Sequence, residues 1–121
     1  MTMFCYQCEQ TARGTGCTAH GVCGKDPQTA ALQDLLIHVA EGVSQYAHRG
    51  RSLGVVHDAA DLFVVEALFA TVTNVDFDPQ RVAALIRHGA AVRDDVGQAY
   101  RDACRTAGRR PDPLAEDAAV E

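Results

Sequence analysis

The sequence contains no tryptophan, and three tyrosines and four phenylalanines are its only aromatic residues. It has no apolar run near the roughly 18–20 residues that a membrane span requires, so we expect no membrane segment. Eleven Lys and Arg against sixteen Asp and Glu give a net charge of −5, which argues against a nucleic-acid-binding surface. No basic stretch followed by an apolar one precedes the first cysteines, so no secretory signal is visible. We therefore expect a cytoplasmic protein.

The 121 residues, of which 47 % are hydrophobic, suffice for about one domain. Residues 1–25 lack periodicity and interleave glycines with cysteines, so we expect an irregular loop that a cross-link must order. Residues 26–108 carry helical patterns. Residues 109–121 are acidic towards their end, and we expect a flexible tail there.

Three helices are predicted in residues 26–108. The pairs Asp26-Pro27 and Asp78-Pro79 are each typical of a helix start, because aspartate caps the first turn and proline suits the first helical position. Glycines at positions 50, 54 and 108 mark helix ends. The middle helix is expected from about residue 58 to 71, followed by a turn at 74–78. Short connections predict an all-α antiparallel three-helix bundle.

The middle helix has apolar side chains on more than one face, which predicts that it is the most buried of the three. These side chains are Leu62, Phe63, Val64, Val65, Leu68 and Phe69.

Four of the five cysteines lie within the first 23 residues, with the spacing Cys5-x2-Cys8-x8-Cys17-x5-Cys23. A disulfide framework is one reading, disfavoured by the missing secretory signal and the odd cysteine count. A structural zinc site is a second, although it favours two Cys-x2-Cys pairs. An iron–sulfur cluster is the third and the favoured one, because glycines let the chain wrap closely around an inorganic core.

The remaining cysteine, Cys104, falls near the apolar stripe of the third helix and is expected to be a buried, inert thiol. His20 lies inside the cysteine loop, where it could donate to a sulfur but is expected to be solvated. Phe4 and Tyr6 flank the first cysteines and could shield the site or anchor the loop on the bundle.

Three segments of the loop resemble the start of the hybrid-cluster proteins, also called prismane proteins or hydroxylamine reductases. They are Phe4-Cys5-Tyr6-Gln7-Cys8-Glu9-Gln10-Thr11, Gly14-Thr15-Gly16-Cys17 and Gly21-Val22-Cys23-Gly24-Lys25. The likeness continues through residues 31–36 and 68–79, and covers about the first 100 residues. The resemblance implies that Cys5, Cys8, Cys17 and Cys23 ligate one [4Fe–4S] cluster.

The resemblance does not carry hydroxylamine reduction to this chain. In the family, that chemistry is implied at a second, hybrid cluster held by a histidine, two glutamates and further cysteines in later domains. Only Cys104 remains here after Cys23, so we assign no catalytic residue.

The favoured function is a small iron–sulfur protein that exchanges one electron with a larger redox partner. Two alternatives stay open, namely a subunit of a split hydroxylamine reductase-like enzyme and a redox or nitric oxide sensor. The family's N-terminal domain is implied to hold two three-helix bundles, and this chain has the length for one. We therefore expect a bare apolar face and a homodimer or tight hetero-complex, with Val and Phe residues of the middle helix contributing.

Overall fold

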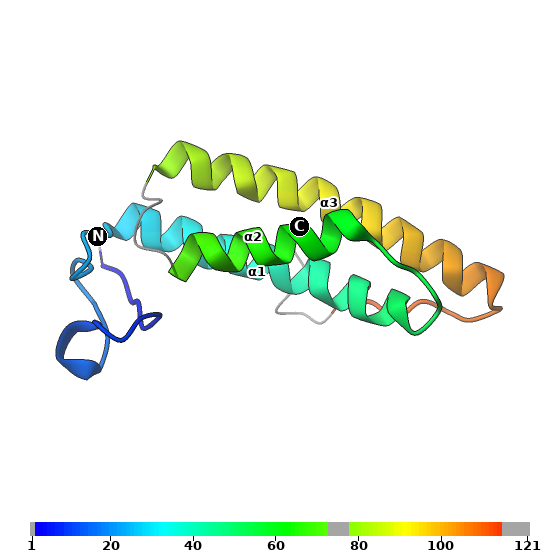
Figure 1. Cartoon of the computed structure of the whole chain (residues 1–121), viewed down its shortest axis with the longest axis horizontal. Coiled ribbons are helices and arrows are strands. Elements are labelled where there is room, and N and C mark those ends of the chain that lie inside the picture. Colours follow the sequence, from blue (N-terminus) through cyan, green and yellow to red (C-terminus); the bar gives the residue numbers. More distant parts are fainter. Residues whose placement is uncertain (1, 73–77, 115–121) are drawn as a thin grey trace.

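The computed structural model describes residues 2–72 and 78–114, and three α-helices dominate this part of the chain (Figure 1). The helices are α1 (Pro27–Arg51), α2 (Asp58–Val72) and α3 (Pro79–Thr106). They pack against one another in an up-down-up order, so α2 runs antiparallel to both neighbours while α1 and α3 run in the same direction. The all-α three-helix prediction is confirmed.

Both Asp-Pro pairs start helices as expected. The Asp26 carboxylate accepts the Thr29 backbone N–H at 2.7 Å, and the Asp78 carboxylate accepts the Gln80 N–H at 3.0 Å. Each carboxylate thus satisfies one of the amide groups that a first turn leaves without an intrahelical acceptor. At the other end of α3, Gly108 has φ +68°, a left-handed conformation that glycine adopts at little cost.

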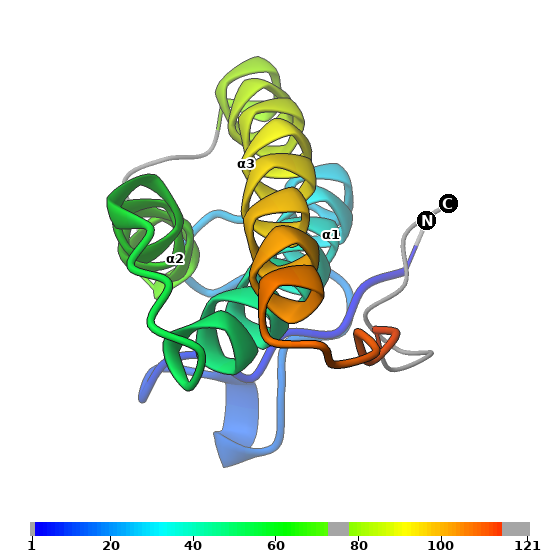
Figure 2. The ribbon, with the colours of Figure 1, turned by 90° about the vertical axis from the view of Figure 1, so that its right-hand side faces the viewer.

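The core lies along the seam between the three helices. α1 and α3 share the most extensive contact, and the end-on view of Figure 2 shows α2 flanking this pair. Phe63 of α2 is fully buried against Gly89 of α3, where a Cβ would collide with the phenyl ring. The most buried aliphatic side chains around this contact are Leu36, Val39, Val43, Val82 and Val96.

The prediction that α2 is the most buried helix is wrong. Its inner face is buried, but Leu62 and Val65 are 60 % and 65 % exposed, and Leu68, Phe69 and Val72 are also exposed. An apolar residue needs a neighbouring element to cover it, and two helices cover only one side of the third. The outer side of α2 is therefore an apolar surface.

Residues 2–26 fold as an irregular loop at one end of the bundle, interrupted by a single 3₁₀ turn at Ala12–Gly14 (Figure 1). The expected turn at 74–78 falls almost wholly outside the described residues, as does the acidic end of the tail from residue 115. Residues 109–114 are non-helical and adjoin the bundle. No helix in the described part of the chain is both long and apolar enough to cross a membrane.

Candidate metal centre

The four cysteines of the N-terminal loop line one pocket. The pocket is also lined by the last two residues of α2, Thr71 and Val72. The four cysteines are Cys5, Cys8, Cys17 and Cys23. Residues 18 positions apart in the sequence are thus brought together, and the end of the bundle forms one wall. All four are free thiols in this structure, so the disulfide reading finds no support.

The loop holds two of these cysteines by backbone pairing. The N–H of Cys5 donates to the carbonyl of Cys17 at 2.9 Å, and the N–H of Cys17 returns a bond of 2.9 Å to the carbonyl of Cys5. In such an antiparallel pair the two side chains project to the same side. The Thr11 hydroxyl, which is buried, adds a bond of 3.1 Å to the Cys5 carbonyl.

The surroundings of Cys17 favour its thiolate form. The backbone N–H of Ala12 lies 3.4 Å from Sγ and donates to it, and it is the largest cause that lowers the pKa of the Cys17 thiol. The backbone N–H of Val22 and the Thr11 hydroxyl lower that pKa further, against the opposing effect of burial. Donors aimed at a sulfur stabilise its negative charge, and a thiolate is the form that binds metals.

A buried cation faces the same pocket. Lys25 is only 3 % exposed, and its Nζ donates to Cys5 Sγ at 3.3 Å and to Gln7 Oε1 at 3.3 Å. Within residues 2–72 and 78–114, no carboxylate lies at ion-pair distance from Lys25. A buried ammonium is costly unless an anion compensates it. Lys25 therefore supplies positive charge beside Cys5 Sγ, and it also interacts electrostatically with Asp34.

Two glycines are required by close approach in the loop. Gly16 has φ +140°, and a Cβ there would collide with the Phe4 ring. A Cβ on Gly21 would lie 2.9 Å from the Lys25 Cβ and 3.2 Å from Cys23 Sγ. Both positions therefore require glycine for close packing within the loop.

The four thiols do not suit a single metal ion as placed. In the described part of the chain, no three His, Cys, Asp or Glu side chains are grouped closely enough to hold one. A tetrahedral zinc site with bonds near 2.3 Å needs sulfurs about 3.8 Å apart. In an iron–sulfur cluster each thiolate binds a different iron, so the ligand sulfurs need not converge on one atom.

The other residues that the sequence analysis singled out lie away from the cysteine sulfurs or are exposed. His20 is exposed, and its Nδ1 lies 3.1 Å from the Gly21 carbonyl rather than at a sulfur. Phe4 and Tyr6 are both 60 % exposed, so neither anchors the loop by burial against the bundle. Cys104 is 1 % exposed within α3, which confirms a buried thiol.

Sequence reasoning missed the roles of Lys25 and Thr11. Lys25 and Arg13 are the only Lys and Arg residues of the loop. A lysine this rare in a cysteine-rich segment could have indicated a contact with the cysteine sulfurs. Nothing in the local sequence pattern indicated that Thr71 and Val72 would line the pocket, because they lie almost fifty residues after Cys23.

Comparison with known proteins places the chain in a family. The model of the Prismane/CO dehydrogenase family matches residues 3–119. The chain belongs to this family.

Its relatives include curated proteins named hydroxylamine reductase. That of Rhodospirillum rubrum is 51 % identical over 112 residues, which are 93 % of this chain and 20 % of the relative. That of Desulfitobacterium hafniense is 52 % identical over 96 residues, 79 % of this chain and 18 % of the relative. That of Geobacter sulfurreducens is 49 % identical over 105 residues, which are 87 % of this chain and 19 % of the relative. The chain spans about a fifth of the length of these relatives.

Proposed function

We propose that Cys5, Cys8, Cys17 and Cys23 hold one [4Fe–4S] cluster, and that the chain exchanges single electrons with a larger redox protein in the cytoplasm. The observation that carries this proposal is the environment of the four thiols. They share one pocket, Lys25 supplies a buried positive charge to it, and backbone N–H groups favour thiolate at Cys17.

A [4Fe–4S] cluster held by four thiolates supplies reversible one-electron chemistry. The chain's own groups hold it and set its potential. Lys25 offsets negative charge on the sulfurs, so it favours the reduced form, which carries one more negative charge. Donation from the Ala12 backbone N–H to Cys17 Sγ acts in the same direction.

The location of the pocket supports exchange with a partner. Cys5, Cys8 and Cys23 are only half-buried, and the loop lies at one tip of the bundle (Figure 1). Electrons could therefore pass to a docked protein without crossing the helices.

The outer face of α2 supports docking beside the cluster. Leu62, Val65 and Val72 lie on this face, and Val72 also lines the cysteine pocket. The charged residues of α2 are Asp58, Asp61 and Glu66, all acidic, and of these Asp61 is paired with Arg51. Two copies packed through α2 would bring like charges together. We therefore propose a different chain with an apolar surface and basic residues at its rim. A homodimer in light scattering, abolished by Val65→Glu, would contradict this choice.

A subunit of a split reductase is the second candidate. The curated relatives are named hydroxylamine reductase, and this chain corresponds to about a fifth of each. Such a subunit would relay electrons to a catalytic centre on the partner. The two candidates differ in the partner that each binds. Identifying the protein captured by this chain, with Val65→Glu as the control that weakens docking, distinguishes them.

The proposal is tested by a redox titration of anaerobically purified protein, followed by EPR. We expect one reversible one-electron transition and a spin near one per chain in the reduced state. A protein that takes up no electron at any accessible potential would refute electron transfer. It would do so even if iron were bound.

A further inference from the structure

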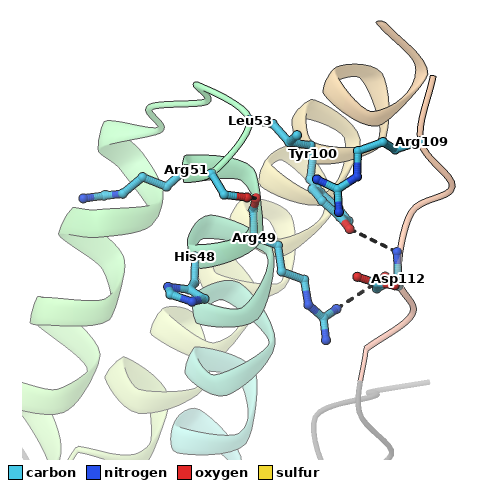
Figure 3. Close-up of a pocket in the computed structure, with 8 residues that line it drawn as sticks. His48, Arg49, Arg51, Leu53, Tyr100, Arg109 and Asp112 are labelled. Atoms are coloured by element: carbon cyan, nitrogen blue, oxygen red, sulfur yellow. Dashed lines mark hydrogen bonds between the residues drawn. The ribbon is translucent and has the colours of Figure 1, made fainter. Parts of the chain in front are cut away.

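A second cavity lies beside the ends of α1 and α3, and Figure 3 shows residues that line it. This end of the bundle is opposite the cysteine loop (Figure 1). Its volume is about 350 Å³, and its walls come from the end of α1, the following turn, α3 and the segment after α3. Cavities of this size accommodate small molecules. The proposed electron transfer does not use it.

Positive charge gathers around this cavity because α1 and α3 end side by side. Arg49, Arg51 and Arg109 line it, and Asp112 is the one acidic lining residue among those that the structure describes. Arg51 turns away from the cavity in Figure 3, and donates to both carboxylate oxygens of Asp61 at 2.8 and 3.0 Å. Arg51 is therefore neutralised, whereas neither Arg49 nor Arg109 forms an ion pair with a carboxylate of residues 2–72 or 78–114.

The two remaining guanidinium groups keep donors available. Arg49 spends one nitrogen on the backbone carbonyls of Asp112 and Pro113, at 3.3 and 2.8 Å, and neutral carbonyls leave its charge uncompensated. Arg109 is exposed, and no acceptor in the described chain takes a bond from it. Figure 3 shows the Asp112 side chain between the side chains of Arg49 and Arg109.

Cations near helix C-termini also stabilise the helix dipole, and this accounts for the presence of arginines at this end. It does not account for Tyr100. This side chain is 96 % buried, from an exposed fraction of 4 %, and its hydroxyl oxygen accepts the Asp112 backbone N–H at 3.0 Å. The hydroxyl hydrogen has no acceptor among residues 2–72 and 78–114. Because Tyr100 lines the cavity, this hydroxyl can donate to a group bound there.

We propose that this cavity binds a small phosphate-type oxyanion, held by Arg49, Arg109 and the Tyr100 hydroxyl. Guanidinium groups match the paired oxygens of phosphate, and the hydroxyl supplies a further donor. The cavity exceeds the size of the bare ion, so the oxyanion is free phosphate or the terminal group of a small phosphomonoester. The Asp112 carboxylate opposes binding by like charge.

The site is tested by isothermal titration calorimetry on the full chain at constant ionic strength. The probes are inorganic phosphate, ribose 5-phosphate and, as a carboxylate control, succinate. We expect Arg109→Gln to weaken phosphate binding at least about tenfold, as loss of a charged hydrogen bond implies. Asp112→Asn should strengthen it several-fold. Arg81→Gln removes the same charge from the exposed start of α3, at the other end of the bundle, and should leave binding unchanged.

Tighter binding of ribose 5-phosphate than of phosphate would identify a phosphomonoester, and equal binding the free ion. The proposal is overturned if no phosphate probe binds at millimolar concentration, or if Arg109→Gln and Arg81→Gln weaken binding equally. Succinate binding as tight as phosphate would overturn the assignment to phosphate. Cysteine ligation is not involved, so these outcomes are independent of the cluster.

Discussion

Lys25 Nζ lies 3.3 Å from Cys5 Sγ, and this contact joins the last residues of the cysteine loop to its first cysteine. A lysine buried to this degree is stable when an anion compensates its charge. The contact therefore connects the fold of the loop with the electrostatics of the proposed cluster, and it is the relationship most open to direct mutation.

Lys25→Met removes the charge and keeps most of the side-chain volume. We expect the cluster's reduction potential to fall by about 50–100 mV, because a unit charge near a partly buried site contributes on the order of 1–2 kcal/mol. An EPR-monitored redox titration measures the change. Lys25→Arg, which retains the charge, should change the potential far less. Arg13→Met removes an exposed cation of the same loop and serves as the matched control. An unchanged potential in Lys25→Met would contradict the assigned role.

Replacing a proposed ligand should have a different effect from replacing the bystander cysteine. Cys8→Ala is expected to abolish stable cluster incorporation, because one iron loses its thiolate. Cys104→Ala should leave the iron content unchanged, since Cys104 is buried within α3 outside the pocket. Iron analysis and the visible absorption of the purified variants measure this. Equal iron loss in both variants would mean that the effect is one of folding.

Gly16→Ala should lower the fraction of chains that carry a cluster. The residue has φ +140°, and the added methyl group would collide with the Phe4 ring, so both backbone and packing oppose the change. Gly14→Ala is the control, because Gly14 has φ +67° and open space around it. We expect Gly14→Ala to cost only about 1 kcal/mol of strain. Phe4→Ala combined with Gly16→Ala should restore part of the loss by removing the collision.

Acidification should reveal the contribution of the Asp26 cap. The Thr29 backbone N–H lowers the pKa of the Asp26 carboxyl, and the Thr29 hydroxyl lowers it further. A carboxyl whose pKa is lower in the folded state stabilises the fold above its unfolded pKa, and this contribution is lost as the pH falls through the folded value. Asp26→Ala should therefore lower Tm at pH 7, with the difference from wild type shrinking below about pH 4. Asp26→Asn retains a capping acceptor without charge, and its Tm should respond less to pH over that interval.

The helices could be predicted because their boundaries are encoded locally. Asp26-Pro27 and Asp78-Pro79 carry both the capping acceptor and the restricted backbone of a first turn, and both helices begin there. The burial of α2 could not be predicted in the same way. Periodicity reports which faces are apolar, whereas burial depends on how many neighbours are present to cover them.

The candidate centre was only partly predictable. The spacing of Cys5, Cys8, Cys17 and Cys23 indicated a shared site, and the structure brings them to one pocket. The buried Lys25 contact could not be predicted, because it depends on how an aperiodic loop folds back on itself. The opposite cavity, which joins Arg49 to Asp112 across the fold, left no local signal in the sequence.

The most direct test of the account is the metal and sulfide content of the anaerobically purified chain. We expect about four irons and four acid-labile sulfides per chain, with negligible zinc. Stoichiometric zinc without iron, in protein that retains its helical circular dichroism, would contradict it.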